Sequence, residues 1–246
     1  MMISKHGEKI LNQLRDIIHL FKETKKVLDA IKRAKQKAIK PGRLEQAKAE
    51  INDANQYLKH VLSIFYNDHK KLLKLLSALD DAVNKRFLFL DKLLLEKAET
   101  SSESELKKLV ALGEEIKDVT LRIHQAAKLE ELGILSQREK PNVNTIKLLD
   151  HINKLTQLPK ISKENEFIKT VEKEILLLKA IDLDILTIFI MLDSMLSHLH
   201  GRAFLISSEN KKILEKIINT YKQAKQKFAD KALSVFQQIK IVKAIK

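Results

Sequence analysis

Residues 44–98 contain neither glycine nor proline, the two residues that interrupt helices most readily. Apolar side chains recur in this segment at intervals of three and four, as at Leu72, Leu76 and Leu79. Because this spacing places them on one face of an α-helix, the segment is predicted to form one long amphipathic helix. The three-four spacing slips once, at Asn67 and Asp68. If the helix bends, the kink is expected near residues 66–69.

The chain has only five glycines and three prolines, and most of them fall where the apolar spacing stops. Serine residues that can cap helix N-termini give further boundaries. No stretch alternates between apolar and polar residues as a half-buried strand does. The sequence predicts helices at residues 4–40, 44–98, 103–132, 145–158, 163–200 and 208–243, and linkers at 99–103, 133–144 and 201–207.

A helix over residues 44–98 is about 80 Å long at about 1.5 Å per residue, whereas a compact chain of this length has a diameter of about 45 Å. An unbroken helix of that length does not fit in a sphere. We therefore predict an all-α fold: an elongated antiparallel bundle of about five long helices and one short helix, packed through coiled-coil-like seams. Residues 1–246 are expected to form a single elongated domain.

The positive charge is concentrated at the two ends of the chain. The formal net charge is +14. Residues 1–41 carry 11 basic and 4 acidic side chains, and residues 202–246 carry 11 basic and 3 acidic ones, while the rest nearly balances. If the first and last helices are neighbours, they form one basic face that attracts a phosphate polymer or an anionic membrane. The candidate anion-binding residues are Lys22, Lys26, Lys32, Arg33, Lys37, Lys40, Lys222, Lys225, Lys227 and Lys231.

The basic residues allow two interpretations. They form either an anion-binding face or only the solvated helix surface of a lysine-rich chain. Lysine outnumbers arginine 39 to 7, and the chain has no tryptophan. Proteins that recognise particular bases form bidentate hydrogen bonds to them with arginine, and proteins that bind single strands stack the bases on aromatic rings. Any binding of nucleic acid is therefore expected to be non-specific and steeply salt-dependent.

No motif in the sequence marks a catalytic or metal site. There is no cysteine, and each glycine stands alone rather than in a phosphate-binding loop. No glutamate lies three residues before a histidine, as it does in di-iron helical bundles. We expect no enzymatic activity, no cofactor and no metal. The lack of cysteine is also typical of a reducing compartment, so a cytoplasmic location is predicted.

Residues 181–200, IDLDILTIFIMLDSMLSHLH, are the most apolar part of the chain, yet they include three aspartates and two histidines. Helical geometry places Asp182, Asp193 and His200 on one side of the helix, with about 16 Å and about 10 Å between successive residues. They are too far apart to bind one metal ion. Because the middle of the segment is apolar all round, we interpret it as a central helix whose polar ends reach water.

This apolar segment allows two other interpretations. Insertion into a membrane is disfavoured, because the most apolar window, residues 175–192, contains three charged side chains. A contact between two copies of the chain is an alternative to burial in the bundle. Its candidate residues are Ile185, Ile188, Phe189 and Leu192.

The sequence as a whole predicts a non-catalytic helical interaction or scaffold protein, which binds a protein partner or a second copy of itself through long helical surfaces. The alternative function is binding of an anionic polymer or surface by the basic terminal helices. Within that alternative, non-specific nucleic acid is favoured over a membrane.

Overall fold

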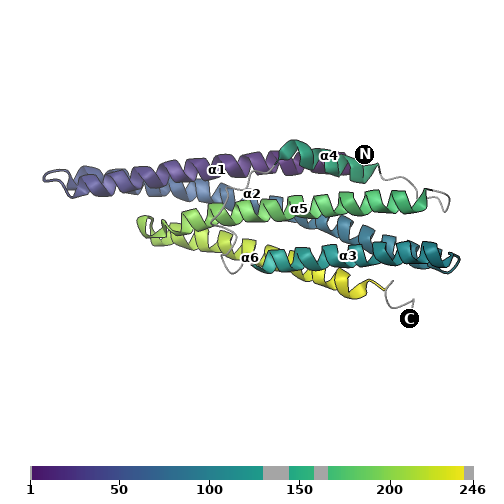
Figure 1. Cartoon of the computed structure of the whole chain (residues 1–246). Helices are drawn as coiled ribbons and strands as arrows, with labels where there is room; N and C mark the ends of the chain where they lie inside the picture. The colour runs from purple at the N-terminus through teal and green to yellow at the C-terminus, as the bar shows by residue number, and fades with distance from the viewer. Residues whose placement is uncertain (1, 130–143, 158–165, 241–246) are drawn as a thin grey trace. The chain divides into compact units, whose positions relative to one another are not determined.

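The computed structural model describes residues 2–129, 144–157 and 166–240. Within these ranges every regular element is helical (Figure 1). The elements are α1 (Met2–Ala38), α2 (Leu44–Ala98), α3 (Glu103–Leu129), α4 (Thr145–Thr156), α5 (Phe167–His200), the short 3-10 helix η2 (Ala203–Leu205) and α6 (Ser208–Gln238). The prediction of an all-α helical bundle is confirmed.

The helices pack into two compact units, which we describe separately. Unit 1 contains Met1–Glu8, Leu76–Met191 and Ala224–Lys246, and unit 2 contains Lys9–Leu75 and Leu192–Gln223. The helices α1, α2, α5 and α6 contribute residues to both units, whereas α3 and α4 belong to unit 1. The single domain predicted for residues 1–246 stays a prediction.

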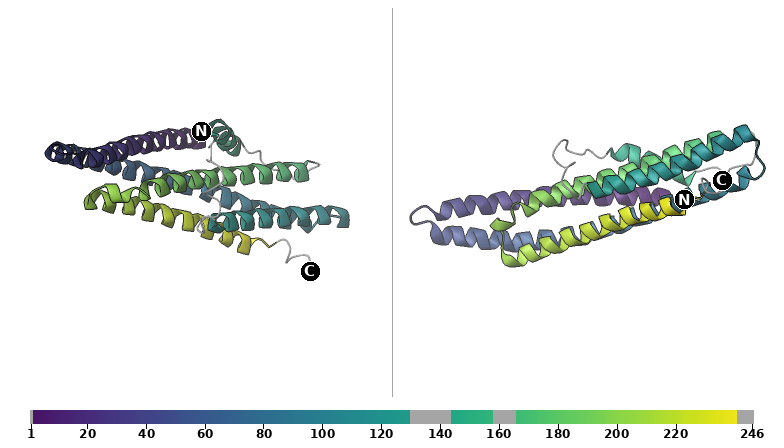
Figure 2. Two further views of the ribbon diagram at one scale, coloured as in Figure 1. Left: turned by 60° about the vertical axis from the view of Figure 1, so that its left-hand side comes forward. Right: turned by 60° about the horizontal axis from the view of Figure 1, so that its bottom comes forward.

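Unit 2 is built from parts of four helices. Within it, α1 and α2 lie side by side in opposite directions, and the three views in Figures 1 and 2 agree on this. The order of the contacts shows that α6 runs parallel to α2 and that α5 lies against α1. The contacts are Lys37–Glu50 between α1 and α2, Lys59–Glu209 and Tyr66–Lys216 between α2 and α6, and Phe21–His198 between α1 and α5.

Unit 1 adds α3 and α4 to its parts of the other helices. Here α3 runs antiparallel to the end of α6, and α5 runs antiparallel to α2. The short helix α4 packs on α5. The contacts are Lys117–Phe236 and His124–Ala229 between α3 and α6, Arg86–Glu174 and Asp80–Asp182 between α2 and α5, and His151–Asp184 between α4 and α5.

The helix ends lie near the glycine and serine residues that predicted them. Gly42 has a φ of 73°, a left-handed conformation that glycine adopts without strain, and it lies in the turn between α1 and α2. The Ser102 hydroxyl accepts a hydrogen bond from the backbone N–H of Glu105 at 3.4 Å, which is one half of a capping box at α3. The Ser207 hydroxyl accepts one from Asn210 at α6 in the same way.

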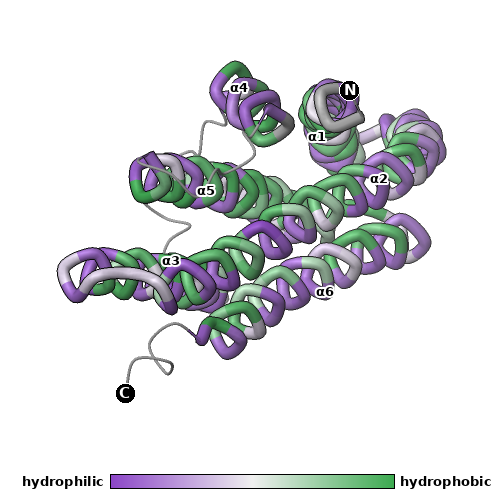
Figure 3. Tube along the Cα trace, turned by 90° about the vertical axis from the view of Figure 1, so that its right-hand side faces the viewer, coloured by the Kyte–Doolittle hydropathy of each residue, from purple (hydrophilic) through white to green (hydrophobic). Residues whose placement is uncertain are grey.

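The helix α2 is continuous through residues 66–69, where the spacing of apolar residues slips, and the possible kink there stays a prediction. His69 accounts for the slip. It is fully buried, and it fills the core position between Phe65 and Leu72, so the three-four spacing continues without a break. Figure 3 shows hydrophobic and hydrophilic residues in turn along each helix, as an amphipathic spacing requires. The slip in the pattern comes from a polar residue inside the core and not from a change of register.

Candidate anion-binding surface

Four of the predicted anion-binding residues are exposed and lie in unit 2: Lys22, Lys32 and Arg33 on α1, and Lys40 in the turn after it. Among the residues that the structure describes, none of these four has a carboxylate partner. Their charge therefore faces solvent without a neutralising neighbour.

The other two predicted residues on α1 are partly neutralised. Lys26 pairs with Glu23 at 2.9 Å on the same helix, and the hydrogen bond between them, followed by their opposite charges, raises the pKa of Lys26 and lowers that of Glu23. Lys37 pairs with Glu50 of α2 at 3.0 Å. Both lysines keep a substantial exposed area, so they add to the basic surface less strongly than the four unpaired residues do.

The net charge divides unequally between the two units. Unit 2 contains 21 basic and 10 acidic side chains, a net charge of +11. Unit 1, although larger, contains 25 basic and 22 acidic side chains, a net charge of +3. The excess that the sequence assigns to the two ends of the chain is thus mainly a property of unit 2.

The candidate lysines on α6 do not all join this surface. Only Lys222 belongs to unit 2, where it is exposed, and Lys227 is exposed in unit 1. Lys225 is buried. Lys231 pairs with Asp81 at 2.7 Å and with Asp80 at 3.3 Å. Burial and pairing argue against Lys225 and Lys231 as contacts for an external anion.

The turn between α1 and α2 exposes two large apolar side chains next to this charge. Ile39 is 84% exposed and Leu44 is 48% exposed. Lys40 and Arg43 lie between them in the sequence. The sequence patterns miss this feature, because each apolar residue sits at a helix end and completes no seam.

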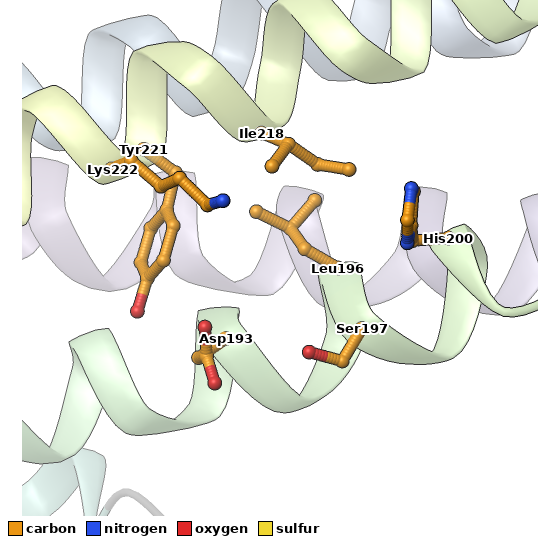
Figure 4. A pocket seen from close by; sticks show the side chains of 7 residues that line it. All are labelled: Asp193, Leu196, Ser197, His200, Ile218, Tyr221 and Lys222. Atoms are coloured by element: carbon orange, nitrogen blue, oxygen red, sulfur yellow. The ribbon is translucent and has the colours of Figure 1, made fainter. Parts of the chain in front are cut away.

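A shallow groove in unit 2 lies between α5 and α6, with a volume of about 160 Å³ (Figure 4). Asp193, Ser197 and His200 line it from α5, and Tyr221 and Lys222 line it from α6. The three α5 residues share one side of the helix, as their spacing predicts. Lys222 and the carboxylate of Asp193 line the same groove from opposite helices.

A cluster of acidic residues and one lysine lies in the core of unit 1. Asp80 accepts hydrogen bonds from Asn84 at 2.8 Å and from Lys231, and burial raises the pKa of Asp80 to about 6. Burial alone would lower the pKa of Lys231, but the hydrogen bonds and charges of Asp81 and Asp80 raise it. The lysine thus offsets only part of the acidic charge.

Asp182 of α5 belongs to the same cluster and corrects the prediction that this stripe reaches water. It is only 3% exposed. Burial, reinforced by the charge of Asp80, raises the pKa of Asp182 well above its ordinary value. Within the described part of the chain, its Oδ1 atom has no hydrogen-bond partner. Asp182 therefore faces α2 inside the core and not solvent.

Whereas the core of unit 1 contains aspartates, the core of unit 2 contains a buried histidine, His69. His69 stacks on Phe65 with ring centroids 6.1 Å apart and lies 6.4 Å from the ring of Tyr221. Burial lowers the pKa of His69 to about 4. Neither ring nitrogen has a hydrogen-bond partner among the described residues. The side chain is therefore neutral at pH 7 and contributes to packing rather than to charge.

His151 of α4 and Asp184 of α5 form a pair that the sequence does not predict. Nδ1 of His151 lies 2.7 Å from Oδ2 of Asp184, and both side chains are largely covered. Burial raises the pKa of Asp184, although the histidine opposes this effect. The pair fastens α4 to α5.

The four residues considered for self-association are all buried by the chain's own helices: Ile185, Ile188, Phe189 and Leu192. The Phe189 ring packs against Phe228 of α6 with centroids 5.4 Å apart. The structure therefore leaves these four side chains almost no surface for a second copy of the chain. The central position predicted for this part of α5 agrees with their burial.

Among the described residues, no three histidine, aspartate or glutamate side chains gather as a metal ion would require. None of the helices there carries a stretch that is long and apolar enough to cross a lipid bilayer.

No protein-family model matches the chain, and no similar protein was found among curated proteins or among solved structures.

Proposed function

We propose that the protein is a non-catalytic helical interaction protein that binds an anionic partner through unit 2. The observation that supports this most is the net charge of +11 on that unit, compared with +3 on unit 1. Lys22, Lys32, Arg33 and Lys40 are exposed there without a carboxylate partner in the described ranges. A cytoplasmic location stays part of the proposal, because the chain has no cysteine.

The chemistry of the surface favours contact with charge over recognition of a sequence. Lysine ammonium groups act as point charges and select little among bases or side chains. If four cations each neutralise one phosphate of duplex DNA, the slope of log K against log salt is about −3.6. Affinity would then fall about 100-fold between about 50 and 200 mM salt.

The test is fluorescence anisotropy with a labelled duplex DNA of random sequence at these two salt concentrations. We expect binding at the lower concentration and a loss of about 100-fold at the higher one. Salt-independent binding would assign the contact to apolar surface. An absence of binding at low salt, both to this DNA and to anionic vesicles, would contradict the proposal.

A protein partner is the second candidate, and one observation favours it. Leu176 and Leu183 of α5 lie seven residues apart, so they share one face, and they are 58% and 47% exposed in unit 1. Such a pair suits a second amphipathic helix. Sedimentation equilibrium of the wild type and of a Leu176→Glu, Leu183→Glu variant tests this for self-association. A wild type that stays monomeric over the concentration range rules out a second copy as that partner.

A further inference from the structure

We infer that the turn between α1 and α2 inserts into the surface of an anionic lipid bilayer. We call residues 39–44 the hairpin tip. This inference rests on the proposed function and names its partner, since the anionic surface bound by unit 2 is then a membrane. The tip joins two features that an interfacial anchor needs, which are exposed apolar side chains and unpaired cations.

The apolar part of the tip is built by two side chains on either side of the turn. Ile39 follows the last residue of α1 and Leu44 is the first residue of α2. Ile39 is the most exposed of the large apolar side chains described in unit 2, at 84%, and Leu44 is 48% exposed. Pro41 and Gly42 between them add no charge. Apolar groups left in water at a projecting turn are stabilised when they enter the boundary between headgroups and acyl chains.

The cationic part surrounds these side chains. Residues 32–50 contain seven basic and two acidic side chains. Both acidic residues are already paired, Glu45 with Lys48 at 2.7 Å and Glu50 with Lys37 at 3.0 Å. The remaining five cations have no carboxylate partner in the described part of the chain: Lys32, Arg33, Lys35, Lys40 and Arg43.

The combination favours a lipid surface over nucleic acid. A phosphate backbone interacts with the cations but gains nothing from an exposed isoleucine or leucine, which have no flat ring on which a base stacks. An anionic bilayer uses both features, because its headgroups attract the cations and its interface accepts the aliphatic side chains.

The chain contains no tryptophan, so a single tryptophan reports on its own surroundings. We would compare Ile39→Trp with Ile146→Trp, a control in unit 1 whose native side chain is 81% exposed. Each variant is mixed with vesicles of phosphatidylcholine alone or with phosphatidylglycerol as about one lipid in three. We expect a blue shift and protection from acrylamide only for Ile39→Trp and only with anionic vesicles. No shift at position 39, or equal shifts at both positions, would overturn the inference.

A second variant separates insertion from simple attraction between charges. Ile39→Ser with Leu44→Ser removes the apolar groups, keeps every cation and alters side chains that contribute little to the core. We expect vesicle binding at least about tenfold weaker with unchanged binding of duplex DNA. Unchanged vesicle binding overturns the inference. If the wild type binds duplex DNA but shows no insertion, the inference fails and the proposed function stands; if it binds neither probe, both fail.

Discussion

The two units differ in where they keep their charge. Unit 2 carries its net charge of +11 on the surface, and the buried ionisable group of its core, His69, is a base held neutral. Unit 1 is nearly balanced overall, but Asp80, Asp182 and Glu174 are buried within it. The same kind of amphipathic helix thus builds a basic surface in one unit and an acidic core in the other, and pH and mutation should affect the two differently.

The largest expected effect comes from a buried ion pair in unit 1. Arg86 binds Glu174 through two hydrogen bonds, of 2.9 and 3.0 Å, and Glu174 is buried. Arg86→Ala leaves that carboxylate without its cation, so we expect the free energy of unfolding to fall by about 3 to 5 kcal/mol. Urea unfolding followed by circular dichroism measures this change.

Arg122→Ala is the matched control, because Arg122 pairs with Asp118 on an exposed helix surface. Its expected effect is below about 1 kcal/mol. Similar losses in both variants would mean that burial does not distinguish the two pairs.

The second effect concerns acid stability and unit 2. The pKa of His69 is about 4 in the folded chain and near its ordinary value of 6.5 when unfolded. The unfolded state therefore binds more protons between these values, and stability is lost as the pH falls from about 6.5 to about 4, by about 3 kcal/mol. His69→Leu should remove this loss, as measured by urea unfolding at several pH values. His60→Gln, at an exposed position of the same helix, should leave it unchanged; an unaltered pH dependence in His69→Leu would refute the buried neutral histidine.

The third effect has the opposite sign and belongs to unit 1. Burial raises the pKa of Asp182 in the folded chain, so the folded state binds protons more readily than the unfolded one and this residue favours folding more as the pH falls. Asp182→Asn removes the ionisable group, and we expect it to stabilise the chain by about 1 kcal/mol at pH 7 and to lose that advantage in acid. Denaturant midpoints at pH 7 and about pH 5 test this. A destabilised variant at pH 7 would show that the carboxylate makes a favourable contact.

The helices could be predicted from sequence because their signals are local. The start of α2 follows from Pro41 and Gly42 just before it, its continuity follows from the absence of glycine and proline within it, and the cap at Ser207 follows from its own side chain. Burial of a polar residue depends on a partner that is distant in sequence. Lys231 and Asp81 are 150 residues apart, and nothing near either one predicts that they meet.

The candidate site was predictable in part for the same reason. The basic composition of α1 and of the turn after it is a local property, so Lys22, Lys32, Arg33 and Lys40 could be named in advance. Ile39 and Leu44 are exposed because none of the described helices covers the turn, and the spacing of apolar residues along the chain does not predict this. The burial of His69 is not predicted, because the pattern considers apolar residues only. Its position between Phe65 and Leu72 nevertheless fits the three-four spacing.

The most direct test of an anion-binding unit 2 is a pair of variants with equal changes in total charge. One replaces Lys22, Lys32, Arg33 and Lys40 of unit 2 with glutamine, and the other replaces four exposed lysines of unit 1, Lys85, Lys108, Lys169 and Lys173. Affinity for duplex DNA and for anionic vesicles is measured at about 50 mM salt. We predict a loss of about 30-fold or more for the unit 2 variant and less than about threefold for the other. Equal losses would show that total charge alone directs the binding and would contradict a surface confined to unit 2.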